Sequence, residues 1–60
     1  SGVIPDWTLK GVVGGRALFA NANGKTSMAE EGDVINGVKI TGIDGDKLSV
    51  KTDNGTLSLK

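Results

Sequence analysis

The sequence lacks most of the side chains on which catalysis and metal binding depend. Its 60 residues include no cysteine, no histidine and no tyrosine, and Trp7 and Phe19 are the only aromatic residues. Without cysteine and histidine there is no disulfide and no ordinary zinc site, so carboxylates remain as the only charged metal ligands. General acid–base catalysis would fall to Asp, Glu or Lys, and a chain this short has little room for a cleft. We therefore expect no catalytic residues, no cofactor and no metal site.

Net charge is also absent, because seven Lys and Arg residues balance seven Asp and Glu residues. A nucleic-acid-binding protein normally carries a basic excess that displaces counterions from phosphate. No apolar run approaches the roughly 20 residues that cross a bilayer as a helix. Ser1–Lys10 lacks the basic start and the apolar core of a signal peptide. We expect no nucleic-acid partner and no insertion of the isolated domain into a membrane.

The chain is long enough for one small domain. A folded chain of this size buries only about 60% of the surface that its unfolded form exposes. Ser1-Gly2 is typical of a cloning remnant, and Pro5 cannot donate a hydrogen bond to a sheet. We therefore divide the sequence into a lead-in or cloning remnant over residues 1–6 and a single β-domain over residues 7–60, excised from a longer protein.

What the sequence does contain is a series of short alternating segments separated by glycine turns. Ten of its residues are glycine. In segments such as Val38–Ile40 and Leu57–Leu59, apolar residues fall two apart, which is the period of a strand with one buried face. The predicted strands are Trp7–Val13, Arg16–Ala22, Lys25–Ala29, Val34-Ile35, Val38–Asp44, Lys47–Thr52 and Thr56–Lys60.

The residues between these segments indicate how the strands connect. Gly14-Gly15 and Asn36-Gly37 each predict a tight reversal. Asn23-Gly24 is the strongest short hairpin signal in the chain and predicts a type I′ turn, in which both central residues have positive φ. Within Val38–Asp44 the apolar alternation falls out of step across Gly42, which predicts a β-bulge or a bend.

Six or seven short strands need a second layer to bury their apolar faces. At this length the simplest solution is an all-β fold, a small β-sandwich of two short antiparallel sheets, with an SH3-like barrel as the variant. The segment Arg16–Ala22 is apolar on both faces, as in a strand that is buried on both sides. The predicted core consists of Trp7, Leu9, Val13, Leu18, Ala20, Met28, Ile35, Val38, Ile40, Ile43, Leu48, Val50, Leu57 and Leu59.

Three short motifs resemble functional sites, and each reads better as a turn. Gly24-Lys25-Thr26 matches the end of a phosphate-binding loop, but Phe19 stands where that loop requires its first glycine. Asp44-Gly45-Asp46 matches part of a calcium loop, but a lysine and a strand follow it. Asn54-Gly55-Thr56 has the form of a glycosylation acceptor, a pattern that is common by chance in turns.

Four segments together form a pattern that covers most of the chain, from Leu9 to Leu59. The pattern resembles the periplasmic homology-region domain of the inner-membrane protein C of type II secretion systems (GspC). The pilus-assembly lipoprotein of type IV pili (PilP) is similar. The segments are Leu9-Lys10-Gly11-Val12-Val13-Gly14, Ala17-Leu18-Phe19-Ala20, Glu31-Gly32-Asp33-Val34-Ile35-Asn36-Gly37-Val38-Lys39-Ile40 with Ile43, and Asn54-Gly55-Thr56-Leu57-Ser58-Leu59.

The resemblance implies a two-sheet β-sandwich without enzymatic activity. Domains of this family dock on the N-terminal periplasmic domain of the outer-membrane secretin and link it to the inner-membrane platform and its other assembly proteins. The resemblance also implies a role in protein transport or pilus biogenesis, a periplasmic location and a parent chain anchored to the inner membrane.

From the residues, we expect the first hairpin to carry the contact. If Trp7, Leu9 and Val13 form its core face, the side chains that point outward are Thr8, Lys10 and Val12, and Arg16 at the turn can bind a partner carboxylate.

Two alternatives belong to other functional classes. A small β-barrel can serve as an SH3-like nucleic-acid or ribosome-associated module, although zero net charge and two aromatic residues argue against that role. A small hydrolytic or metal-dependent enzyme is the least favoured alternative, since the chain has neither histidine nor cysteine.

Overall fold

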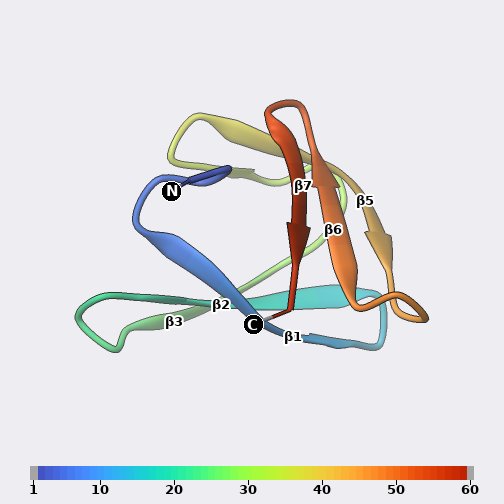
Figure 1. Cartoon of the computed structure of the whole chain (residues 1–60), viewed down its shortest axis with the longest axis horizontal. Coiled ribbons are helices and arrows are strands. Elements are labelled where there is room, and N and C mark those ends of the chain that lie inside the picture. The colour runs from blue at the N-terminus through green and yellow to red at the C-terminus, as the bar shows by residue number, and fades with distance from the viewer. Residues whose placement is uncertain (1, 60) are drawn as a thin grey trace.

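The computed structural model describes residues 2–59, which form seven strands in two antiparallel sheets (Figure 1). The first sheet has the strand order β1-β2-β3 and the second has the order β4-β5-β6-β7. In residues 2–59 there is no helix of the length and apolarity needed to cross a membrane. The strands are β1 (Trp7–Val13), β2 (Arg16–Asn21), β3 (Thr26–Ala29), β4 (Val34–Ile35), β5 (Val38–Asp44), β6 (Ser49–Thr52) and β7 (Gly55–Ser58).

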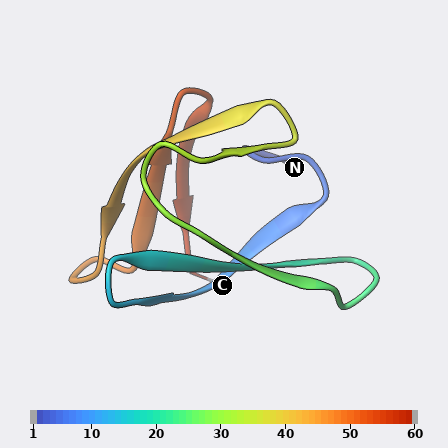
Figure 2. The same cartoon turned by 180° about the vertical axis from the view of Figure 1, so that it is seen from behind.

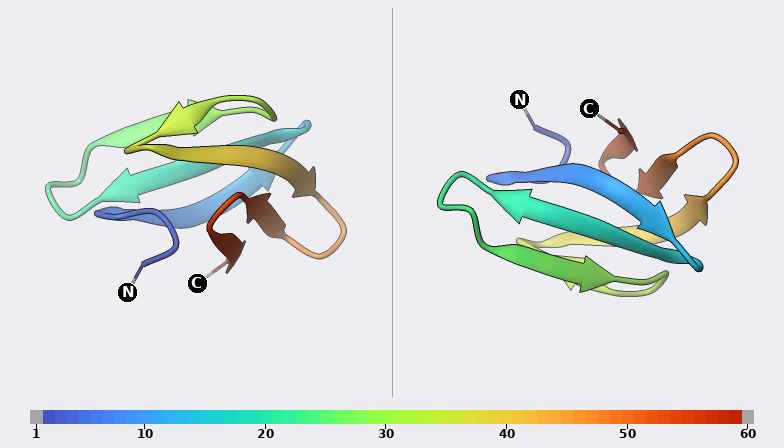
Figure 3. Two further views of the ribbon diagram at one scale, coloured as in Figure 1. Left: turned by 90° about the horizontal axis from the view of Figure 1, so that it is seen from above. Right: turned by 90° about the horizontal axis from the view of Figure 1, so that it is seen from below.

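The two sheets pack together with β6 and β7 standing across the end of the first sheet (Figure 2), and the arrangement confirms the predicted all-β fold of two antiparallel sheets. The two sheets do not close into a barrel in residues 2–59. The edge strand β1 pairs only with β2, and the edge strand β7 pairs only with β6. β5 bends midway, so that it runs above the first sheet with β4 and then down its end with β6 and β7 (Figures 1 and 3). The bend coincides with a register shift between Ile40 and Gly42, which is the bulge that the sequence predicts there.

The core lies between the layers and is built around Phe19, which is fully buried. Leu9 joins it from the first sheet, and Ile40 and Val50 join it from the second. The buried residues that the sequence predicts are Leu9, Val38, Ile40 and Val50, and those that it misses are Ile4, Ala17, Phe19 and Ala29. Four more predicted core residues are half-buried and pack against this core: Trp7, Ile35, Ile43 and Leu57.

The predicted core is wrong for β2, whose opposite face is buried. Ala17 and Phe19 point inward and are fully buried, while Leu18 and Ala20 lie on the outer face of the sheet and are only half-buried. Met28 is opposite Leu18 in β3, so it also faces outward and is 49% exposed. Because both faces of β2 are apolar, the alternation alone does not show which face is buried. The buried face is the one that carries the aromatic side chain, Phe19.

The prediction for the inner face of β1 is wrong beyond Leu9. A register shift falls between Leu9 and Gly11, so Lys10 is the extra residue of a β-bulge. A bulge reverses the alternation of the side chains after it. Val12 therefore packs against the core, and Val13 points to solvent with 69% of its surface exposed.

Two predicted core residues at strand ends are also exposed. Leu48 has a φ of 53° and belongs to the turn before β6, and Leu59 lies just beyond the end of β7. The predicted strand ends at Ala22, Lys25 and Lys47 likewise lie outside the strands. Lys60, the last residue of the predicted final strand, lies outside the described residues.

The turn between β2 and β3 differs from its prediction. Gly24 has a φ of 83°, but Asn23 does not have a positive φ, so this is not a type I′ turn. Instead the Gly24 N–H donates to the Asn21 carbonyl at 3.0 Å, and the Asn21 side chain accepts hydrogen bonds from the N–H groups of Asn23 and Lys25. Paired positive φ values occur instead at Gly14-Gly15, which joins β1 to β2, and at Asn36-Gly37, which joins β4 to β5.

The N-terminal segment, residues 2–6, is part of the fold rather than a lead-in. Ile4 has only 1% of its surface exposed and lies in the core, so the folded unit begins before residue 7. Two asparagine side chains of the second sheet bind the segment. Asn36 Nδ2 donates to the Pro5 carbonyl at 2.7 Å, and Asn54 Nδ2 donates to the Val3 carbonyl at 2.8 Å.

The start of β7 gives a first testable prediction. Gly55 has a φ of 121°, a conformation that is essentially restricted to glycine, and an added Cβ would lie 3.6 Å from Val3 Cγ2. We expect Gly55→Ala to lower the free energy of unfolding by about 1–3 kcal/mol, measured by urea denaturation. Gly45→Ala is the control, because Gly45 has no positive φ and a Cβ there meets no atom within 4 Å. Equal stability of the two variants would contradict the prediction.

Candidate docking surface

The outer face of the three-stranded sheet carries an apolar surface that faces away from the core. Leu18 lies at its centre, opposite Met28 on β3 and opposite Gly11 on β1. A Cβ on Gly11 would lie 3.9 Å from Leu18 Cβ, so the absent side chain leaves the flank of Leu18 open. We call this surface the outer-face patch, and it consists of Gly11, Val13, Leu18, Ala20 and Met28.

Charged side chains border the outer-face patch at both ends. Arg16 Nε lies 3.5 Å from Glu30 Oε2, and both side chains are 60% exposed. An ion pair this exposed is weak, and the guanidinium has further N–H donors that can bind a second carboxylate. Lys10, the extra residue of the β1 bulge, is exposed near the other end. The patch therefore has an apolar centre and a polar rim, as protein interfaces do.

The structure places three of the four predicted contact residues at this face. Thr8 pairs with Ala20 and is half-buried, Lys10 is exposed, and Arg16 borders the patch through its pairing with Val13. Val12 is not available for the outer-face contact, since the bulge turns it toward the core. Val13, Leu18 and Met28 are exposed or half-exposed apolar residues that the sequence assigned to the core.

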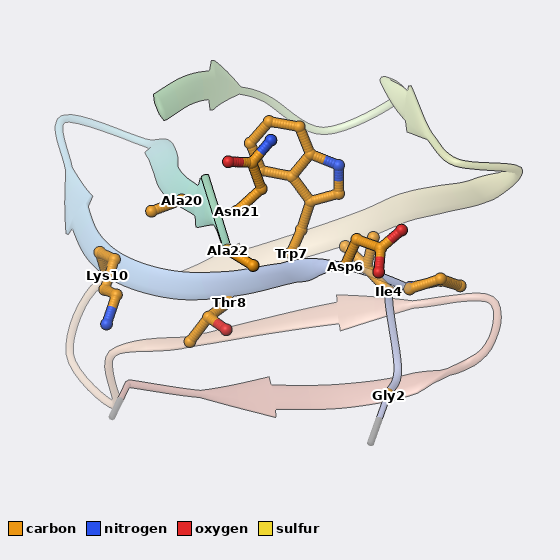
Figure 4. A pocket seen from close by; sticks show the side chains of 10 residues that line it. Gly2, Ile4, Asp6, Trp7, Thr8, Lys10, Ala20, Asn21 and Ala22 are labelled. Atoms are coloured by element: carbon orange, nitrogen blue, oxygen red, sulfur yellow. The ribbon is translucent and has the colours of Figure 1, made fainter. Parts of the chain in front are cut away.

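A shallow depression of about 700 Å³ lies beside the patch, where the N-terminal segment meets β1 and β2 (Figure 4). Thr8 and Lys10 point to one side of β1, and the Trp7 indole points to the other side (Figure 4). Asp6 and Lys10 are the charged residues of its lining, so it holds one carboxylate and no pair of acids. Among residues 2–59, no three carboxylates lie close enough together to hold a metal ion.

A second hollow, of about 300 Å³, lies between β1 and β7. Its apolar lining includes Leu9 and Leu57, and its hydroxyl groups come from Thr8, Thr56 and Ser58. Both strands have one edge without a ladder partner in residues 2–59, since the sandwich is open at this point. Such edges are able to pair with a strand from another chain.

The turn between β5 and β6 is held by the side chain of Asp44. Asp44 Oδ1 accepts hydrogen bonds from the N–H groups of Asp46 at 2.9 Å and Lys47 at 3.0 Å. These bonds, led by the one from Lys47, hold the pKa of Asp44 below its ordinary value of 3.8. The sequence Asp44-Gly45-Asp46 therefore closes a hairpin, as predicted.

The lowered pKa of Asp44 gives a prediction for acid stability. The carboxylate stabilises the fold fully above the pKa that it has in the unfolded chain, and this contribution is lost as the pH falls through the lower pKa of the folded state. We expect Asp44→Asn to reduce stability at neutral pH and to flatten the loss of stability on acidification, followed by urea midpoints. Asp46→Asn is the control that keeps the Asp44 acceptor. The same acid dependence in Asp44→Asn and the parent chain would refute the assignment.

No protein-family model, curated protein or solved structure matches this chain. A functional assignment therefore depends on the surfaces described above and on the pattern of the sequence. Of these surfaces, the outer-face patch combines exposed apolar side chains with a charged rim, whereas the first hollow has one aspartate and one lysine in its lining and the second has three hydroxyl side chains.

Proposed function

We propose that this chain is a non-enzymatic interaction module of a bacterial secretion or type IV pilus machine. It docks through the outer-face patch on the N-terminal periplasmic domain of the outer-membrane secretin. In this role it sits in the periplasm and links the secretin to the inner-membrane platform, to which its parent chain is anchored. The observation that carries the proposal is a sheet face on which Val13 and Met28 are exposed and Leu18 between them is only half-buried.

The apolar centre of the patch supports docking on a protein rather than on a small ligand. Val13 and Met28 are 69% and 49% exposed, and they flank Leu18 on neighbouring strands. Exposed apolar side chains that gather on one face mark an interaction site, whereas single ones are normal on any surface.

The charged rim supplies orientation for such a contact. Arg16 reaches Glu30 within its own chain and keeps donors for a partner carboxylate. Contacts of this kind raise the rate of encounter and select the partner more than they raise affinity. The sequence resemblance to homology-region domains points to a secretin as this partner, and it covers both strands, β1 and β2, on which most of the patch lies.

A module of this size is expected to bind weakly by itself. The patch can bury roughly 1,200 Å² or less in total, which is the low end for specific interfaces. A micromolar dissociation constant corresponds to about −8 kcal/mol. Many copies around a ring-shaped secretin would then provide avidity, because the second and later contacts form at high effective concentration.

Isothermal titration calorimetry tests the proposal directly. The isolated domain is titrated with the N-terminal domains of a type II secretion secretin and of a type IV pilus secretin from the source organism. We expect micromolar binding to one of them and a weaker signal with the other. No heat of binding to either domain at high micromolar concentration would contradict the proposal.

A further inference from the structure

The side-chain hydrogen bonds that hold the N-terminal segment come from two asparagines, each of which is followed by a glycine. Asn36 and Asn54 each stand directly before a glycine, in the turns between β4 and β5 and between β6 and β7. Their Nδ2 atoms donate to the carbonyls of Pro5 and Val3. A carbonyl only accepts hydrogen bonds, so each contact requires the amide nitrogen of the asparagine.

Asparagine before glycine is the sequence context that is most prone to deamidation, because glycine leaves the backbone nitrogen unhindered. The glycine nitrogen attacks the side-chain carbon Cγ of the asparagine. A new N–Cγ bond forms, the bond from Cγ to Nδ2 breaks, and ammonia leaves with the proton of the glycine N–H. Water then opens the resulting succinimide ring and leaves an aspartate or isoaspartate.

We propose that Asn36 and Asn54 are deamidation sites that the N-terminal segment protects. Their reaction in turn weakens the attachment of that segment. Ring closure requires each side chain to turn back over its own backbone, which breaks its bond to Pro5 or Val3. The sites therefore react only while the segment is detached. This inference does not depend on the proposed docking function.

The product cannot restore the contact that protected the site. Deamidation replaces the donor Nδ2 with a carboxylate oxygen, which faces a carbonyl oxygen in the folded geometry. Two acceptors repel each other, and the carboxylate gains more from water than from this position. Each reaction therefore permanently removes one of the two asparagine bonds to the segment, so that the segment detaches more often and the second site opens more frequently.

A third Asn-Gly pair provides an internal reference. Asn23-Gly24 lies in the turn between β2 and β3, and no hydrogen bond among residues 2–59 joins its side-chain amide to the N-terminal segment. Trypsin places the three pairs in separate peptides, covering residues 17–25, 26–39 and 52–60, because it cleaves after Arg16, Lys25, Lys39 and Lys51. Peptide mapping by mass spectrometry thus follows each site in one sample.

The first test detaches the segment without changing the asparagines. Ile4→Val trims the buried side chain that holds the segment in the core, and the variant is incubated at mildly alkaline pH beside the parent chain. We expect deamidation of Asn36 and Asn54 to become several-fold faster and that of Asn23 to stay unchanged. Unchanged rates at Asn36 and Asn54, or equal acceleration at all three sites, would overturn the proposal. Ala17→Gly, a core change in β2, controls for a general loss of stability. We expect it to give no selective acceleration of deamidation at Asn36 and Asn54.

The second test introduces the product directly. The backbone N–H of Trp7 donates to the Ile4 carbonyl at 3.2 Å, so the exchange of this amide proton with deuterium reports on the attachment of the segment. We expect Asn36→Asp and Asn54→Asp each to speed the exchange of this amide several-fold, and Asn23→Asp to leave it unchanged. Unchanged Trp7 exchange in both of the first two variants would show that the asparagine bonds do not hold the segment.

Discussion

Replacing Ile4 with alanine is expected to lower the free energy of unfolding by about 2–5 kcal/mol. Ile4 is 1% exposed and belongs to the same buried cluster as Phe19 and Leu9, so the change removes apolar contacts and leaves a cavity. A domain of 60 residues has little stability to spare. The loss is therefore large enough to unfold a substantial fraction of the molecules, which urea denaturation followed by Trp7 fluorescence measures.

The control for this prediction is Val34→Ala. Val34 lies on β4 and is 63% exposed, so its truncation is expected to change stability by less than about 0.5 kcal/mol. If Ile4→Ala is as stable as Val34→Ala, the N-terminal segment is not part of the core. The assignment of residues 2–6 to the folded unit would then be wrong.

Replacing Leu18 with aspartate is expected to weaken secretin binding by about 30-fold, which corresponds to about 2 kcal/mol. Leu18 is the centre of the outer-face patch, and a carboxylate there would be buried against apolar groups of the partner without a cation. The side chain faces away from the core, so the fold is retained. Calorimetric titration measures the affinity, and the circular dichroism of the variant checks the fold.

Val34→Asp is the matched control for binding. It places the same carboxylate on an exposed apolar position of the other sheet, outside the patch. We expect its affinity for the secretin domain to equal that of the parent chain. A larger loss in Val34→Asp than in Leu18→Asp would move the docking site to the four-stranded sheet.

The strands themselves are predictable from the sequence because their signals are local. β1, β4 and β5 have the predicted bounds, and the glycine turns separate the others to within a few residues. The bulge in β5 was also predictable, since Gly42 interrupts an otherwise regular alternation. Leu9-Lys10-Gly11-Val12 has the same spacing of apolar residues around a glycine as the bulge region of β5. The same interpretation of Gly11 would therefore have predicted the bulge in β1.

The candidate site was harder to predict, because it depends on which face of β2 is buried. β2 is apolar on both faces, and only its packing against the second sheet buries Phe19 and leaves Leu18 outside. The position of Ile4 is likewise a tertiary effect. Pro5 and Asp6, which has a φ of 69°, separate it from β1, so no strand periodicity includes it. Its chain neighbours Val3 and Pro5 accept hydrogen bonds from two asparagines that are distant in the sequence.

The most direct test of the docking account is an NMR titration of the labelled domain with the secretin N-terminal domain. The account predicts that chemical-shift changes concentrate on the outer-face patch and its rim, at Val13, Arg16, Leu18 and Met28. Changes confined to β4–β7, or to the open edges of β1 and β7, would contradict it. So would unchanged spectra at high micromolar concentrations of both secretin domains.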